Sequence, residues 1–131
     1  MRVLIVEDSD SICRMIEALV SARGFDVKSA GSGARGLEEA FAWHPHVILL
    51  DINLPGAYDG LDVCAKLRAD ASTKDTPVII ISAMNDDEVK RKAATAGANA
   101  FYEKPFSPLA LLKEIEALAR KSEAVMKASE R

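Results

Sequence analysis

Three acidic residues and a lysine stand where apolar stretches of the chain give way to polar ones. Glu7 and Asp8 follow the first apolar run, Asp51 ends the third, and Lys104 follows the last. Carboxylates held close together repel one another and are costly to desolvate without a counter-charge. Mg²⁺, or Mn²⁺ in its place, relieves this repulsion because it prefers oxygen ligands and keeps several waters. The residue types therefore indicate a metal site that a phosphate oxygen can complete, although capping of a following helix is an alternative use of Glu7 and Asp8.

Two groups suited to binding a phosphate follow the fourth and fifth apolar runs. Ser82, followed by Ala83, offers a hydroxyl donor. Lys104 offers a point charge that can reach a phosphoryl oxygen, and Pro105 fixes the turn that aims it. Considered alone, Ser82 is more simply explained as a residue at the start of a helix, and Lys104 as an exposed surface charge. Together with the acids they indicate a site for a phosphoryl group.

Asp51 is the candidate nucleophile of this set. An aspartate side chain is ionised at neutral pH, so it can attack a phosphoryl group and form an acyl phosphate without a general base. Phosphoryl transfer then mainly requires positioning and charge neutralisation, which a metal ion and Lys104 supply. The plainer alternative is that Asp51 caps the loop that Pro55 and Gly56 introduce.

These side chains meet only if the apolar runs are neighbouring strands of one sheet. Strands are expected at Arg2–Val6, Asp26–Ala30, Val47–Asp51, Pro77–Ser82 and Ala100–Glu103. Because amphipathic helical segments separate them, the chain predicts an α/β fold with one parallel sheet and helices on both faces. The first, third and fourth strands are the most apolar and should be central. This favours the flavodoxin-like, doubly wound (βα)5 order 2-1-3-4-5, whose ligand site lies at the carboxyl ends of strands one and three.

The helical segments are expected to bury one apolar face each. The first carries Ile12, Met15, Ile16, Leu19 and Val20 at helical spacing, and the last continues the spacing through Leu111, Ile115, Leu118, Ser122 and Val125. The last helix therefore continues past the domain, either as a solvated extension or as a seam for a dimer or partner. Cys13 and Cys64 fall on apolar faces, which predicts buried free thiols rather than a disulfide or metal site.

Composition limits the class of protein. The chain has 131 residues, 49% hydrophobic and 28% charged, which suits one soluble domain. Its apolar runs are far shorter than the roughly 20 residues of a membrane span, and the first strand leaves no room for a signal peptide. The net charge of −3 and the lack of a basic cluster argue against direct nucleic-acid binding. We expect a cytoplasmic protein with no membrane contact.

Four motifs of the chain occur together in one known family. They are Val-Leu-Ile-Val-Glu7-Asp8, Asp51-Ile-Asn53-Leu-Pro55 with Asp59-Gly60, Ser82-Ala83, and Phe101-Tyr-Glu-Lys104-Pro105-Phe106. Residues 1–121 thereby resemble the receiver domains of two-component response regulators, either stand-alone or cut from a longer protein. Residues 122–131 would be a helical C-terminal extension or linker.

The resemblance assigns a role to each residue of the motifs. Asp51 would be the phosphoacceptor, and the metal ligands would be Glu7, Asp8, Asp51 and the carbonyl of Asn53. The groups that bind the phosphoryl oxygens would be Ser82, Ala83 and Lys104. The switch residues would be Ser82 and Phe101, with Tyr102 in place of Phe101 if the register is off by one. Pro105 is a candidate cis proline.

The resemblance also implies a phosphoacceptor switch rather than an enzyme. A histidine kinase or histidine phosphotransfer protein would supply the phosphoryl group. The surface of the fourth helix, fifth strand and fifth helix would then change and control an unknown protein target. The chain would act as a monomer or weak dimer.

One loop departs from the family pattern. It has one residue more than the commonest form, at Gly56 to Tyr58. We expect Tyr58 to be exposed near the site and to alter access to Asp51.

Two other functions fit parts of the sequence. Gly31-Ser-Gly-Ala-Arg-Gly36 matches the G-x-G-x-x-G pattern of dinucleotide-binding units, but that interpretation leaves Glu7, Asp8 and Lys104 unused. A haloacid-dehalogenase-like phosphatase also uses an aspartate nucleophile, yet it needs a carboxylic acid two residues later, where this chain has Asn53.

Overall fold

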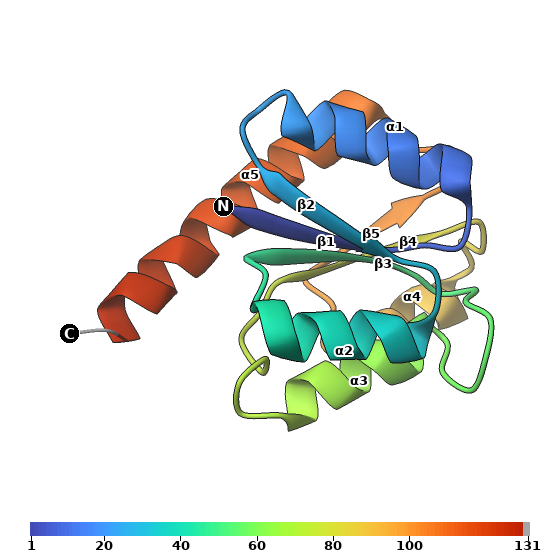
Figure 1. The fold of residues 1–131 in the computed structure, drawn as a ribbon. Coiled ribbons are helices and arrows are strands. Elements are labelled where there is room, and N and C mark those ends of the chain that lie inside the picture. Colours follow the sequence, from blue (N-terminus) through green and yellow to red (C-terminus); the bar gives the residue numbers. More distant parts are fainter. Residues whose placement is uncertain (130–131) are drawn as a thin grey trace.

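A five-stranded parallel sheet forms the middle layer of the part of the molecule that the structure describes (Figure 1). The structure is a computed structural model and describes residues 1–129. The strands are β1 (Arg2–Val6), β2 (Asp26–Ala30), β3 (Val47–Asp51), β4 (Val78–Ser82) and β5 (Ala100–Glu103). Their order is β2-β1-β3-β4-β5, and each neighbouring pair is parallel. The flavodoxin-like fold and strand order predicted from the sequence are confirmed.

Helices cover both faces of the sheet. They are α1 (Asp10–Ser21), α2 (Gly33–Trp43), α3 (Gly60–Ala69), α4 (Asp87–Thr95) and α5 (Pro108–Ser129). Figure 1 shows α1 and α5 on one face and α2, α3 and α4 on the other. Each helix follows a strand and crosses over to the next, so the residues after every strand lie at one edge of the sheet.

Alternating side chains of the central strands build a separate core on each face. In β1, Val3 and Ile5 pack beneath α1 and α5, whereas Leu4 and Val6 pack beneath α2 and α3. Strands β1, β3 and β4 are almost wholly buried, but β2 and β5 are partly exposed. The polar residues of β2 and β5 therefore lie at the sheet's edges, as the sequence indicated.

Two details of the elements differ from the expectation. Strand β4 begins at Val78 rather than Pro77, because proline has no N–H to donate to a neighbouring strand. Met15 is exposed although its spacing placed it on the apolar face of α1. It lies about 100° around the helix from the buried Ile16, outside the stripe that faces the sheet.

The remaining expectations about the helices concern the cysteines and the chain's end. Cys13 and Cys64 are free and buried. Helix α5 runs beyond Lys121, burying Ser122 and projecting past the sheet (Figure 1). Residues 130 and 131 of the expected extension lie outside the described residues. Across residues 1–129, the helices are too short or too polar to pass through a bilayer.

Candidate functional site

The acidic residues converge at the carboxyl ends of β1 and β3. Val6 and Leu50 are partners in these adjacent strands, so the residues that follow, Glu7 and Asp51, lie side by side. Carboxylate oxygens of Glu7, Asp8 and Asp51 all lie within 4.8 Å of one another. The structure thus brings together the three acids that the sequence singled out.

The three carboxylates differ in their exposure to water. Glu7 and Asp51 are only 2% and 4% exposed, whereas Asp8 is exposed. The N-cap of α1 is Ser9, whose hydroxyl accepts a hydrogen bond from the N–H of Ile12. The acids at positions 7 and 8 are therefore not the capping residues of this helix, and they are available for another role.

Lys104 bridges the two buried carboxylates. Its Nζ donates to Glu7 Oε1 at 2.8 Å and to Asp51 Oδ2 at 3.1 Å. Its backbone N–H donates to the carbonyl of Ser82 at 2.8 Å, and the Lys104–Pro105 peptide bond is cis. Burial lowers the pKa of Lys104, but the hydrogen bonds to Glu7 and Asp51 outweigh burial and raise it. Lys104 therefore stays protonated and positively charged at this edge of the sheet.

Glu7 is short of partners for its charge. Its Oε2 is buried and has no hydrogen-bond partner among the described residues. The pKa of Glu7 is raised to about 7. Burial is the largest cause, and the upward effect of the neighbouring Asp51 exceeds the downward effect of Lys104. A buried carboxylate oxygen without a donor is costly, so this group favours either a proton or a cation.

The donor set fits a hard divalent cation. Two buried carboxylates and an exposed carboxylate with access to water are oxygen ligands of the kind that Mg²⁺ takes. The backbone of Asn53 is close, because its N–H donates to Asp51 Oδ1 at 3.2 Å. The residues that would hold the ion are therefore Glu7, Asp8, Asp51 and Asn53.

Ser82 reaches the same edge from the next strand. Asp51 pairs in register with Ile81, so Ser82 lies one position further along β4. Its Oγ is fully buried and accepts a hydrogen bond from the N–H of Met84 at 3.0 Å. A hydroxyl that accepts this bond still has its own proton to donate. Ala83, which follows, is exposed.

The two aromatic residues of β5 face opposite sides of the sheet. Phe101 packs with the core beneath α2, α3 and α4, whereas Tyr102 packs with the core beneath α1 and α5. The Tyr102 hydroxyl donates to the carbonyl of Ala110 in α5 at 3.4 Å. Only Phe101 of these two residues shares a face with α4.

Glycines in the first turns of α2 and α3 allow close approach to neighbouring segments. A Cβ on Gly60 would collide with the carbonyl of Asp51, so the residue that opens α3 must lack a side chain. A Cβ on Gly33 would lie 2.6 Å from the carbonyl of Tyr58, and one on Gly36 would lie 2.8 Å from Val6. Close packing of α2 thus accounts for Gly33 and Gly36 without a dinucleotide, whereas a Cβ on Gly31 would meet nothing within 4 Å.

Tyr58, in the loop with the extra residue, is less exposed than expected. Tyr58 is half-buried rather than exposed, because it packs on the core beneath α2 and α3. The ammonium of Lys66 lies 4.8 Å from the centre of its ring. The side chain is thus held against the helices, and its effect on access to Asp51 stays a prediction.

One contact at this edge has no sequence signal. Asn85 Nδ2 donates to Glu103 Oε2 at 2.8 Å, which ties the loop after β4 to the end of β5. Lys90 of α4 adds an ion pair with Glu103 at 4.0 Å. Amides and charges in polar segments are common, so nothing in the spacing distinguishes these three residues.

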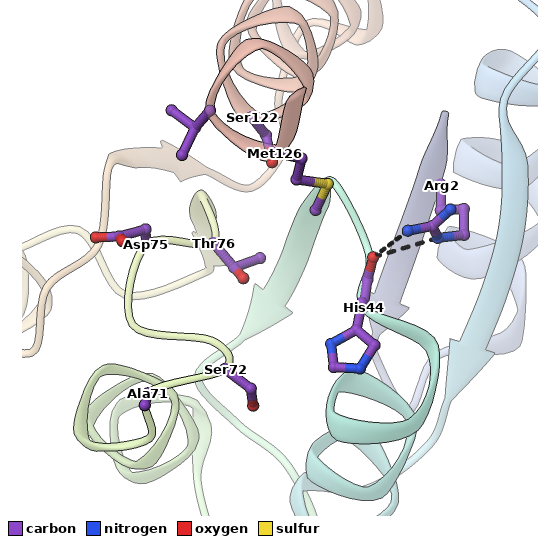
Figure 2. Close-up of a pocket in the computed structure, with 9 residues that line it drawn as sticks. Arg2, His44, Ala71, Ser72, Asp75, Thr76, Ser122 and Met126 are labelled. Atoms are coloured by element: carbon purple, nitrogen blue, oxygen red, sulfur yellow. Dashed lines mark hydrogen bonds between the residues drawn. The ribbon is translucent and has the colours of Figure 1, made fainter. Parts of the chain in front are cut away.

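A hollow of about 360 Å³ lies at the opposite, amino edge of the sheet. It is lined by Arg2, His44, Ala71, Ser72, Asp75, Thr76, Ser122, Val125 and Met126. Figure 2 shows the Arg2 side chain donating to the backbone carbonyl of His44. The hollow includes none of the acids near Asp51, so the residues suited to phosphoryl chemistry lie at the other end of the strands.

Comparison with known proteins identifies a family. Residues 3–116 match the family described as the response regulator receiver domain. Among curated proteins, the chain is 32% identical over 128 residues to the DNA-binding dual master transcriptional regulator RpaA of Synechocystis sp., a match that covers 98% of this chain and 53% of that protein. It is 34% identical over 119 residues to the response regulator PleD of Caulobacter vibrioides, covering 91% of this chain and 26% of PleD. The chain thus spans about half or less of these relatives.

Solved structures agree in fold. The chemotaxis protein CheY4 of Vibrio cholerae superposes with a TM-score of 0.83 at 30% identity, covering 89% of this chain and 97% of CheY4. The receiver domain of the Francisella response regulator 1452 superposes with a TM-score of 0.85 at 28% identity, covering 92% of this chain and 98% of that one.

Proposed function

The chain belongs to the receiver domains of two-component response regulators, and from this premise we propose that Asp51 accepts a phosphoryl group and that the domain works as a phosphorylation switch. The observation that carries the proposal is the pair of buried carboxylates, Glu7 and Asp51, bridged by Lys104. Burying two carboxylates with one lysine costs stability, which favours a functional rather than a structural role for the cluster. It also supplies a nucleophile and a positive charge within hydrogen-bond distance of each other.

In the reaction, a carboxylate oxygen of Asp51 attacks the phosphorus of a phosphohistidine or small phosphodonor. The bond from phosphorus to the Asp51 oxygen forms as the bond to the donor's leaving group breaks, and an acyl phosphate results. Lys104 then exchanges its contact with Asp51 for one with a phosphoryl oxygen. Ser82 donates its hydroxyl proton to another phosphoryl oxygen, and the N–H of Ala83 lies beside that group.

Glu7, Asp8, Asp51 and the carbonyl of Asn53 hold Mg²⁺ in this proposal. When bound, the ion neutralises charge on the carboxylates and on the phosphoryl oxygens. Mn²⁺ takes the same kind of oxygen ligands and is an alternative. The partnerless oxygen of Glu7 supports this part of the proposal.

Phosphorylation changes the surface formed by α4, β5 and α5. Lys104 and Ser82 shift toward the new dianion, which alters the end of β4 and the loop after it. Phe101 supports this route because it lies on the same face of β5 as α4. The Tyr102 hydroxyl is hydrogen-bonded to α5 on the other face, so Tyr102 is the weaker candidate for a switch residue.

The donor is a histidine kinase or histidine phosphotransfer protein, and the domain itself catalyses only its own phosphorylation and dephosphorylation. The switch comprises residues 1–121, with the remaining helical segment as an extension or linker. Its output target is a protein, and we propose a cytoplasmic setting.

Intact-protein mass spectrometry tests the proposal. The chain is incubated with Mg²⁺ and acetyl phosphate, and the expected product carries one added phosphoryl group. Asp51→Asn and a sample without Mg²⁺ should gain none. A wild-type protein that stays unmodified would contradict the proposal, and catalytic turnover of a phosphomonoester would favour the phosphatase alternative.

A further inference from the structure

The two ends of helix α4 are attached to the rest of the fold in different ways. Helix α4 spans Asp87–Thr95, and Ala93 is its one buried residue within the described chain. A helix with so little buried surface depends on its ends for its position. How each end is held therefore decides which end can move.

The C-terminal end of α4 is closed by its own backbone. Gly97 has a φ of +99°, and its N–H donates to the carbonyl of Ala94 at 3.0 Å. The N–H of Ala98 donates to the carbonyl of Ala93, also at 3.0 Å. These two bonds form a Schellman motif, which satisfies the last carbonyls of the helix.

Helix α3 then holds this end through two side chains. Arg68 Nε donates to the carbonyl of Gly97 at 3.0 Å, and Cys64 Sγ donates to the carbonyl of Ala96 at 3.3 Å. The same guanidinium donates through Nη2 to Asn99 Oδ1 at 2.9 Å and through Nη1 to the carbonyl of Thr76 at 2.7 Å. One part-buried arginine thus ties α3, the loop before β4 and the loop before β5 to the end of α4.

The position of Arg68 leaves little freedom. A Cβ on Gly97 would lie 2.7 Å from the Arg68 side chain, so the arginine stem lies directly against the turn. Asn99 Oδ1 also accepts from the N–H of Val78 at 2.9 Å, so the amide that receives Arg68 is itself fixed to β4. Movement of this end would break several charge-assisted hydrogen bonds at once.

Apart from Val89, which is half-buried against the core, the N-terminal end of α4 is held by exposed contacts. Asp86 caps the helix by accepting from the N–H of Val89. Contact with β5 comes from the hydrogen bond of Asn85 to Glu103 and the 4.0 Å ion pair of Lys90 with Glu103. Glu103 is 48% exposed, and exposed pairs of this kind contribute little to stability. This end directly follows the loop that begins at Ser82.

We propose that Arg68, assisted by Cys64, fixes the C-terminal end of α4 as a pivot, so that α4 responds to the site by swinging its N-terminal end. The proposal rests on the proposed function, because the stimulus is phosphorylation of Asp51. Arg68 is a positioning residue in this account. It lies at the edge of the sheet opposite to Asp51 and limits how far the structural change travels along α4.

Backbone NMR with amide hydrogen exchange tests the pivot, using Mg²⁺ with beryllofluoride as the probe. In the wild type, the probe should shift amides at Asp51 and Lys104 and in residues 83–90, whereas Gly97 and Ala98 keep their shifts and protection. Arg68→Lys keeps the charge but loses the planar fork. It should speed exchange at Gly97 and Ala98 by about tenfold or more and extend the probe-induced shifts to the end of α4.

The matched control is Arg91→Lys, which alters an exposed arginine on α4 itself. It should match the wild type. If Arg68→Lys binds the probe and its shifts stay confined to residues 83–90, the pivot is overturned. Equal probe-induced shifts along the whole of α4 in the wild type would also overturn the pivot. This measurement uses the wild-type protein alone, so it holds even if Arg68→Lys fails to fold. No shifts at Asp51 and Lys104 in the wild type would instead overturn the proposed function, and the pivot with it.

Discussion

At the amino end of the strands, the Arg68 guanidinium donates hydrogen bonds to backbone carbonyls and to the side-chain amide oxygen of Asn99. At the carboxyl end, Lys104 faces the two buried carboxylates of Glu7 and Asp51, and one oxygen of Glu7 has no partner among the described residues. The first arrangement satisfies its polar groups. The second leaves excess negative charge in a buried place, which lowers stability unless a cation binds there.

One end of the sheet thus supports the fold, and the other end is available for function. Groups at the amino end pair within the protein, as in the mutual backbone and imidazole contacts of Arg2 and His46. Groups at the carboxyl end are arranged for partners that come from outside. Removing a charged side chain should therefore lower stability at the amino end and raise it at the acidic cluster, and four predictions test the contrast between the two ends.

The largest effect should come from Arg68→Ala. The variant loses the guanidinium bonds and leaves the carbonyls of Thr76 and Gly97 without this donor. We expect the free energy of unfolding to fall by about 3 kcal/mol. Urea unfolding monitored by circular dichroism measures it. The exposed control Arg91→Ala should change stability by less than about 0.5 kcal/mol, and equal losses in the two variants would remove the contrast.

Asp51→Asn should raise stability. The substitution removes one of two neighbouring buried negative charges while Asn keeps an oxygen that can accept from the N–H of Asn53. In the absence of Mg²⁺, we expect the free energy of unfolding to rise by about 1 kcal/mol. Asp75→Asn, at an exposed aspartate of the amino edge, should leave it nearly unchanged. A destabilised Asp51→Asn protein would show that the acidic edge is not under electrostatic strain.

His46 should make the amino edge sensitive to acid. Its Nδ1 accepts from the N–H of Arg2, and burial, followed by the charges of Arg2 and the N-terminal amine, lowers its pKa below 6.5. The unfolded chain then binds a proton before the folded one, so the stability due to His46 is complete above pH 6.5 and is lost as the pH falls through the lowered pKa.

Urea unfolding of the wild type and of His46→Asn, each at about pH 8 and about pH 5, isolates this loss as the difference between the two proteins. His46→Asn keeps an acceptor that does not titrate and should reduce the loss, whereas His44→Asn, on the exposed neighbour, should not. Glu7 contributes the opposite slope, because its pKa is raised from 4.5 to about 7 and its contribution falls as the pH rises through that range. An unchanged pH dependence in His46→Asn would contradict the assignment.

The smallest effect should come from Asn85→Ala. Its hydrogen bond to Glu103 is exposed, so we expect a loss of about 0.5 kcal/mol or less. The matched substitution at the other end is Asn99→Ala, which removes the acceptor of both Arg68 and the N–H of Val78 and should cost about 2 kcal/mol. Thermal unfolding of both variants compares them, and similar costs would argue that α4 is held equally at its two ends.

The sequence was sufficient for the strands and for the placement of the candidate site residues because both depend on local patterns. Apolar runs that stop at Glu7, Asp51 and Ser82 predict strands and also place those residues at one edge. The order of the strands followed from their polarity, since the edge strands carry Lys28 and Glu103.

The features that the sequence did not predict depend on contacts between distant segments. Arg68 reads as an ordinary charged residue of a helix, because its partners at positions 76, 97 and 99 become neighbours only after folding. The missing partner of Glu7 Oε2 likewise requires coordinates. Tyr58 was expected to be exposed because its loop is polar and glycine-rich, but the start of α2 and Lys66 provide a surface on which it packs.

The proposed switch requires that Asp51, rather than another acid of the cluster, carries the phosphoryl group. Acyl phosphates are reduced by borohydride, which converts a phosphorylated aspartate to homoserine and leaves other carboxylates unchanged. Borohydride treatment after incubation with Mg²⁺ and acetyl phosphate, followed by peptide mass spectrometry, should therefore find homoserine at position 51 and aspartate at position 8. Homoserine at position 8, or at neither position in a protein that has gained a phosphoryl group, would contradict the account.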